Sequence, residues 1–188
     1  MTTIQIDKSD KRLKAVKFLT ACMSKNDERF HCKHFKVESD QSAIATDGHR
    51  LHWVYDLALA PGYYQVHKNN KTSVLIEKVY ELDTLEGSYP DYVDILSIPD
   101  DGKTFDIMFQ DIPGGCDVSG VYTTIIRQME STTLNFDYVS DVYSALEGDV
   151  VSCIVPPNEK TGLGEIETCK PVHFQRNGFQ AVIMPKRV

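Results

Sequence analysis

The 188-residue chain has no apolar run near the roughly 18 to 20 residues that a membrane span needs, and no apolar stretch follows its basic N-terminus. It has no CxxC pair to hold a metal or a redox disulfide, and no P-loop sequence to hold phosphates. The lack of an apolar run argues against a membrane or secreted protein. We expect a cytoplasmic protein whose five scattered cysteines are reduced and mostly structural: Cys22, Cys32, Cys116, Cys153 and Cys169.

The net charge of -7 hides a strong asymmetry along the chain. Residues 1–36 contain nine Lys or Arg and four Asp or Glu, whereas residues 72–158 contain three and sixteen. The first region therefore has a net charge of +5 and the second of -13. One interpretation is a face that meets phosphates on an otherwise acidic protein, and the simpler one is a solvated basic helix.

Hydrophobic periodicity predicts a strand, a helix and three strands, twice in succession. We therefore expect an α+β fold of one domain, with two half-domains, about 1–70 and 116–188, related by a pseudo-twofold axis. Residues 71–115 would be an inserted or remodelled β connection, with a strand at 104–109. The expected elements are a strand at 3–6, a helix at 10–24 and strands at 30–38, 41–46 and 50–57, then a strand at 118–128, a helix at 135–147 and strands at 149–155, 165–175 and 178–184.

The helix at 10–24 is amphipathic. One side would face the core through Ala15, Val16, Leu19, Cys22 and Met23. The other side would present a basic stripe suited to phosphates, made of Lys11, Lys14, Lys17 and Lys25. The second helix has no such stripe, because its charged residues are Asp137, Asp141 and Glu147.

The segment ATDGHRL at 45–51 has two readings from its residues alone. It is either a tight turn in which Gly48 supplies a positive φ, or part of a catalytic Asp/His pair. No nucleophile or second carboxylate completes a catalytic site. A cluster of His and Cys residues invites a zinc site, but their spacing does not match that of known zinc ligands. We therefore expect structural or surface side chains at His31, Cys32, His34, His49 and His52. A metal-dependent hydrolase using Asp47 is the least favoured alternative.

Three separated segments are more specific in combination: ATDGHRL at 45–51, EGSYPDYVDIL at 86–96 and AVIMPKRV at 181–188. In this order they resemble segments of the bacterial DNA polymerase III beta subunit, the sliding clamp. The segment KRLKAVKFLTACM is similar to the helix that opens the second domain of that family. The helix at 135–147 is similar to the last helix of its third domain.

The resemblance implies a pocket that binds short linear peptides of DNA polymerases, clamp loaders and repair proteins. Its first wall would be Thr46, Gly48, His49, Arg50 and Leu51, and its second Pro90 and Ile95. The third wall would be the C-terminal segment, which by itself could equally be a frayed tail: Val182, Met184, Pro185, Arg187 and Val188. The pocket would bind without catalysis, metal or cofactor, and the four lysines would contact the backbone of double-stranded DNA.

The chain also departs from that family. It is about half as long and matches the opening half of the second domain and the closing half of the third, without the first. The family's ring has six domains and twelve helices, so a chain with two helices would need six copies to encircle DNA. Asp94 replaces a commonly basic residue. The resemblance therefore implies either a minimal sliding clamp that forms a homo-oligomer or a non-encircling decoy that competes for clamp-binding proteins.

Overall fold

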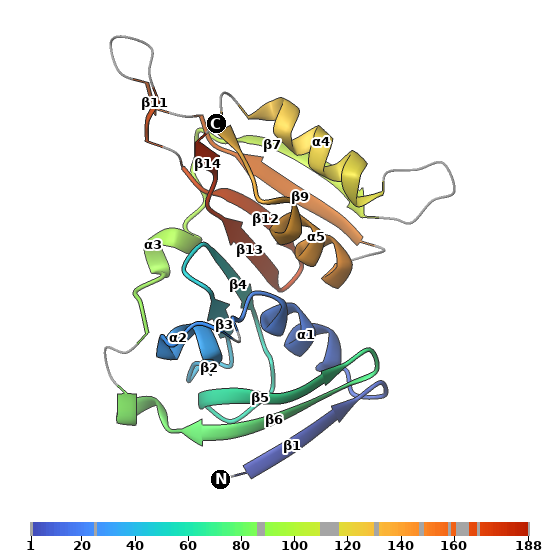
Figure 1. Ribbon diagram of the computed structural model, residues 1–188, viewed down its shortest axis with the longest axis vertical. Helices are drawn as coiled ribbons and strands as arrows, with labels where there is room; N and C mark the ends of the chain where they lie inside the picture. The colour runs from blue at the N-terminus through green and yellow to red at the C-terminus, as the bar shows by residue number, and fades with distance from the viewer. Residues whose placement is uncertain are drawn as a thin grey trace. The chain divides into compact units, whose positions relative to one another are not determined.

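The computed structural model describes residues 2–24, 26–85, 89–109, 117–129, 132–146, 149–157, 159–160, 166–168 and 170–187. The chain forms two compact units, Met1–Asp91 and Tyr92–Val188. Each unit is an antiparallel sheet with helices packed on it, so the expected α+β class is confirmed (Figure 1). No helix in the described ranges has both the length and the hydropathy that crossing a membrane requires.

The sheet of unit 1 has the strand order β1-β6-β5-β2-β3-β4, and all neighbours are antiparallel. Helix α1 packs on this sheet through contacts with β3, β4 and β6. A short helix, α2, precedes β2, and a 3-10 turn, η1, follows β6. The bounds are β1 (Thr2–Asp7), α1 (Leu13–Ala21), α2 (Phe30–Lys33), β2 (His34–Val37), β3 (Ala43–Thr46), β4 (Arg50–Val54), β5 (Gly62–Asn70), β6 (Ser73–Tyr80) and η1 (Leu82–Leu85).

The predicted N-terminal helix is confirmed, although it is shorter than expected. Val16, Leu19 and Cys22 are fully buried, as the periodicity predicts, and Phe18 joins them. Ala15 and Met23 are only half-buried. The expected strand at 30–38 is wrong at its start, where the chain forms the helix α2. The rings of Phe30 and His34, one helical turn apart, stack with their centroids 4.2 Å apart, which favours the helix.

The sheet of unit 2 has the strand order β13-β12-β9-β7. Helices α4 and α5 pack against each other, and α4 also contacts β7 and β9. Two small pairs, β10 with β11 and β8 with β14, complete the unit. The bounds are α3 (Val93–Leu96), β7 (Lys103–Phe109), α4 (Val118–Gln128), β8 (Thr132–Thr133), α5 (Phe136–Ala145), β9 (Asp149–Val155), β10 (Glu159–Lys160), β11 (Ile166–Thr168), β12 (Val172–Arg176), β13 (Phe179–Ile183) and β14 (Lys186–Arg187).

The prediction of a strand at 118–128 is wrong, because this segment is the helix α4. The Asp117 carboxylate caps the helix by accepting a hydrogen bond from the Gly120 N–H at 2.9 Å. Val121 and Ile125, four residues apart, are the buried side chains of this helix. The β-branched residues that suggested a strand thus lie on the buried side of a helix. The capping aspartate and tertiary packing favour the helix and outweigh the local preference of these residues for a strand.

The two described strands within residues 71–115, β6 and β7, belong to different sheets. Strand β6 is central in unit 1, between β1 and β5, and β7 is an edge strand of unit 2. The half-domain boundaries and the pseudo-twofold axis stay predictions. Cys22, Cys32 and Cys153 are free and buried, while Cys116 and Cys169 lie outside the described residues.

Candidate functional site

The turn between β3 and β4 is built by the side chains of the ATDGHRL segment. The Thr46 hydroxyl accepts from the Gly48 N–H at 3.0 Å and donates to the Arg50 carbonyl at 2.7 Å. Asp47 Oδ1 accepts from the N–H groups of His49 and Arg50 at 2.9 and 3.0 Å. Gly48 has φ +87°, a conformation that L side chains rarely adopt, so a glycine is needed here.

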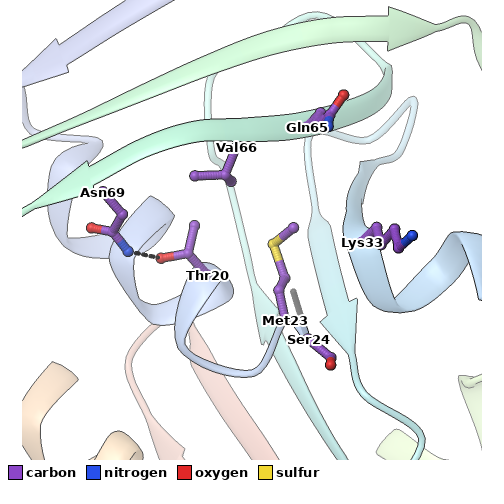
Figure 2. Close-up of a pocket in the computed structure, with 7 residues that line it drawn as sticks. All are labelled: Thr20, Met23, Ser24, Lys33, Gln65, Val66 and Asn69. Atoms are coloured by element: carbon purple, nitrogen blue, oxygen red, sulfur yellow. Dashed lines mark hydrogen bonds between the residues drawn. The ribbon is translucent and has the colours of Figure 1, made fainter. Parts of the chain in front are cut away.

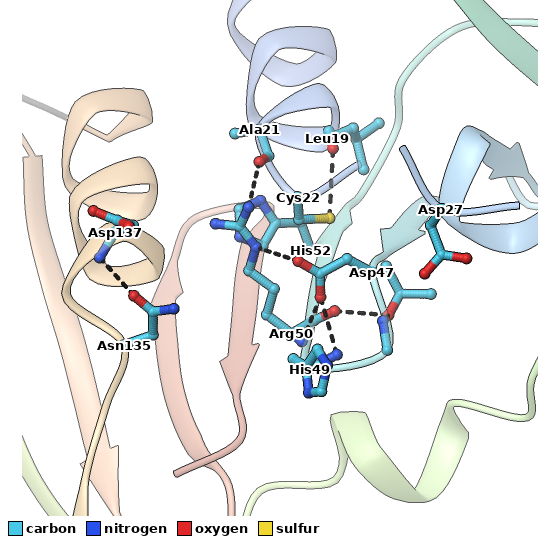
Figure 3. Close-up of polar contacts among 12 residues, drawn as sticks. Leu19, Ala21, Cys22, Asp27, Asp47, His49, Arg50, His52, Asn135 and Asp137 are labelled. Carbon is cyan, nitrogen blue, oxygen red and sulfur yellow. Dashed lines mark hydrogen bonds and ion pairs between the residues drawn. The ribbon is translucent and has the colours of Figure 1, made fainter. Parts of the chain in front are cut away.

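Arg50 connects this turn to helix α1 (Figure 3). Its guanidinium is nearly buried, with 8% of the residue exposed, and it donates to Asp47 Oδ2 at 3.0 Å and to the Ala21 carbonyl at 2.7 Å. Ala21 ends α1, where unpaired carbonyls carry partial negative charge. Arg50 therefore fixes the turn from inside unit 1.

The five residues expected in the first pocket wall differ in exposure. Thr46 and Leu51 are buried like Arg50, with 5% and 4% exposed, whereas Gly48 and His49 are exposed at the tip of the turn. Any ligand of this turn would thus meet the tip first, with the buried residues as its support. The role of the five as a pocket wall stays a prediction.

Arg29 is a residue of this region that sequence reasoning missed. It donates to the Asp47 carbonyl at 3.1 Å and forms an ion pair with Asp27 at 2.6 Å. Its side-chain hydrogen bonds hold the pKa of Asp27 below the ordinary value. The same spacing occurs at Asp10 and Arg12, where the carboxylate also accepts from the arginine N–H at 2.9 Å. This repeated D-x-R spacing was the available signal.

His52 is fully buried on β4, next to the turn. Its ring stacks on Phe18 with centroids 4.3 Å apart, and Nδ1 lies 2.6 Å from the Phe18 carbonyl. Burial lowers the pKa of His52 to about 3, with a smaller contribution from the charge of Arg50, so the ring is neutral at pH 7. The described residues contain no group of three or more His, Cys, Asp or Glu able to hold a metal ion.

Unit 2 brings another part of the predicted site together. Helix α3 contacts β13, and Gln180 Nε2 donates to the Leu96 carbonyl at 2.8 Å. Ile95 of α3 is 39% exposed and Met184, directly after β13, is 43% exposed. Val182 is buried and Pro185 is half-buried. Arg187 pairs with Thr132 through the strands β14 and β8, and Val188 lies outside the described residues.

More apolar surface borders Ile95 than the sequence motifs indicated. Val93, at the start of α3, is 66% exposed, and Ile98, just after it, is 48% exposed. Val93 and Ile95 on this short helix, with Ile98 just after it, form an exposed apolar surface of the kind that often marks a binding site. Sequence reasoning missed Val93 and Ile98, which the VDILSI pattern could have indicated.

Pro90 is exposed at the end of unit 1, next to a residue that ties it to the sheet. The Tyr89 hydroxyl donates to the Ile44 carbonyl at 3.1 Å, and Ile44 is on β3. Pro90 and the turn that follows β3 are therefore both attached to one strand of unit 1. The predicted site residues thus form two sets, with Pro90 and the turn in unit 1, and the α3 and β13 residues in unit 2.

The basic stripe lies on and before α1. Lys11 is exposed, Lys14 and Lys17 are half-buried, and Lys25 lies outside the described residues. The Lys17 ammonium also donates to the Lys71 carbonyl. Helix α1 carries Lys14 and Lys17 and no acidic residue, whereas α4 and α5 together carry one arginine, Arg127, and two aspartates, Asp137 and Asp141.

Comparisons with known proteins define the class of fold. No family model matches the chain, and no curated protein matches it. Solved structures do match. "Caulobacter crescentus pol III beta" matches with a TM-score of 0.59 and 15% identity over 100% of this chain and 66% of that one. A DNA polymerase sliding clamp from Pseudomonas aeruginosa matches with a TM-score of 0.54 and 14% identity over 99% and 67%.

A third match is the DNA polymerase III subunit beta from Borrelia burgdorferi, solved in complex with a natural product. Its TM-score is 0.58 at 11% identity, over 100% of this chain and 63% of that one. The chain therefore has the fold of a DNA sliding clamp and spans about two thirds of the length of these structures. The resemblance to the bacterial DNA polymerase III beta subunit, which three sequence motifs predicted, is confirmed at the level of the fold.

Proposed function

We propose that this protein is a non-catalytic, sliding-clamp-like accessory factor of DNA replication that binds short linear peptides of polymerases, clamp loaders or repair proteins. The observation that carries the proposal is the clamp fold combined with two sets of site residues at the motif positions. One set is the turn whose tip is His49, with Pro90. The other is the apolar surface of α3 and the end of β13.

The residue chemistry supports peptide binding rather than catalysis. Asp47 has both carboxylate oxygens engaged, Oδ1 in the turn and Oδ2 with Arg50, so it is committed to structure. The exposed aliphatic side chains Ile95 and Met184 suit apolar anchors of an extended peptide, and Met adapts its shape to different partners.

Replacing Met184 by glutamate tests the peptide site. The charge placed on an apolar contact should weaken binding of a fluorescently labelled clamp-binding peptide by at least about tenfold, measured by anisotropy. Val150→Glu is the matched control, because Val150 is also an exposed aliphatic residue of unit 2 but lies on β9. Equal affinities of the two variants would show that the peptide binds elsewhere.

The DNA part of the proposal rests on α1. If Lys11 and Lys14 contact phosphates, the double variant Lys11→Ala/Lys14→Ala should reduce the slope of log affinity against log salt by about 2, since each contact contributes about 0.9. Duplex DNA binding between 50 and 200 mM salt measures this slope. Lys103→Ala, which removes an exposed lysine of unit 2, should leave it unchanged. An unaltered slope in the double variant removes the DNA contact from the proposal.

A second candidate function is a non-encircling competitor for clamp-binding proteins. The charge of unit 2 favours it, because one arginine and two aspartates on α4 and α5 would repel rather than attract phosphates. Light scattering separates the two functions. Six copies per particle would support a ring, whereas one or two copies would support the competitor.

A further inference from the structure

A cavity of about 230 Å³ opens within unit 1, between the C-terminal end of α1 and strand β5 (Figure 2). Its apolar lining comes from Met23, just after α1, and from Val66 of β5. Polar side chains complete the lining: Thr20, Ser24, Lys33, Gln65 and Asn69. None of these residues belongs to the peptide site or to the lysine stripe proposed above.

A β-bulge in β5 shapes this cavity. Between Val66 and Lys68 the pairing advances by two residues in β5 but by one in β6. The extra residue shifts the alternation of side chains, so Val66 and Asn69 point to the same face of the sheet. The Asn69 amide donates to the Thr20 hydroxyl of α1 at 2.9 Å, which identifies this face as the one that α1 covers. A small valine and an amide therefore stand where larger apolar side chains would close the space.

The size of the cavity suits one side chain. A volume of about 230 Å³ is large enough to take one apolar side chain of a ligand. The described lining residues include one cation, Lys33, and no carboxylate. They also include no aromatic ring, which sites for unpaired nucleic-acid bases use for stacking.

We propose that this cavity is an anchor site for an acidic linear peptide. A Leu, Met or Phe side chain of the peptide lies against Met23 and Val66, and a neighbouring carboxylate of the peptide pairs with Lys33. Lys17, a lysine of the stripe on α1 that does not line the cavity, adds positive charge one helical turn before Thr20. Charge complementarity therefore selects an acidic partner at this site.

The test is an NMR titration of the full-length, ¹⁵N-labelled protein with the capped peptide Gly-Asp-Phe-Glu-Gly. The side-chain amides of Gln65 and Asn69 should shift in a saturable way. Lys33→Glu should weaken this binding roughly tenfold, and Val66→Phe, which fills the cavity, should abolish the shifts. Lys8→Glu is the matched control, because it reverses an exposed charge of unit 1 outside the cavity and should leave the affinity unchanged.

Three outcomes would overturn the proposal. One is the absence of saturable shifts at Gln65 and Asn69 at millimolar peptide. Another is equal binding of a peptide in which lysines replace the two acidic residues, and the third is stronger saturation of the same amides by a short single-stranded oligonucleotide. Thermal melting of each variant identifies loss of folding, and the Lys33→Glu result decides the case if Val66→Phe does not fold.

Discussion

Replacing Arg50 by alanine should lower the free energy of unfolding by about 3 to 5 kcal/mol, the cost of removing one partner from a buried ion pair. Asp47 would lose its partner at Oδ2 with only 12% of its side chain exposed, and the Ala21 carbonyl would lose its hydrogen bond. Urea unfolding at pH 7 measures the loss. Lys8→Ala, which removes an exposed charge from the same unit, should change stability by less than about 0.5 kcal/mol.

A second variant separates the buried charge from the loss of packing. Asp47→Asn/Arg50→Met leaves no unpaired charge and keeps an oxygen at position 47 for the two N–H groups of the turn. It should therefore be more stable than Arg50→Ala. A loss below about 1 kcal/mol for Arg50→Ala would mean that Arg50 does not fix the turn from inside. Its expected place in an exposed pocket wall would then be favoured.

The second large effect is acid destabilisation through His52. The pKa of this histidine is about 3 in the folded protein and near 6.5 when unfolded, because burial disfavours the charged ring. Below pH 6.5 the unfolded chain binds a proton that the folded chain does not. Stability is therefore lost as the pH falls from 6.5 towards 3, by about 1.4 kcal/mol per pH unit. Between pH 7 and pH 4 His52 accounts for about 3 kcal/mol.

The variant His52→Gln removes this titration and keeps an N–H donor for the Phe18 carbonyl. The stability difference between pH 7 and pH 4 should shrink by about 3 kcal/mol relative to the unmodified protein. Phe18→Leu is the control, because it disturbs the same ring stack without removing a titrating group, and it should lower stability equally at both pH values. An unchanged pH dependence in His52→Gln would place the acid-sensitive group elsewhere. Burial also lowers the pKa of His34 and His173, and these are the next candidates.

Much of the fold could be predicted from local patterns. The helix at α1 and the strands β3, β4 and β13 follow from periodicities of 3.6 and 2, which report directly which side chains are buried. The error at α4 arose because valines, isoleucines and threonines favour strands locally, while the cap at Asp117 and the packing against α5 favour a helix.

The candidate site was less accessible from the sequence. The resemblance identified the motif positions, but it did not indicate which of these residues are buried. Arg50 was expected in the wall of a peptide pocket, and nothing in ATDGHRL reveals that its guanidinium lies 2.7 Å from the Ala21 carbonyl, 29 residues earlier in the chain. The cavity under α1 was equally hidden, because a bulge depends on the pairing of β5 with β6.

The sequence alone determined the class of fold, the basic N-terminal region, the acidic middle region and the three motif positions. These properties depend on periodicity, charge and short segments, which need no knowledge of distant contacts. Only the tertiary structure decided which polar side chains support the fold and which meet solvent. Burial and hydrogen bonding join residues far apart in the chain, so Arg50 and His52 became internal while His49, Ile95 and Met184 remained exposed.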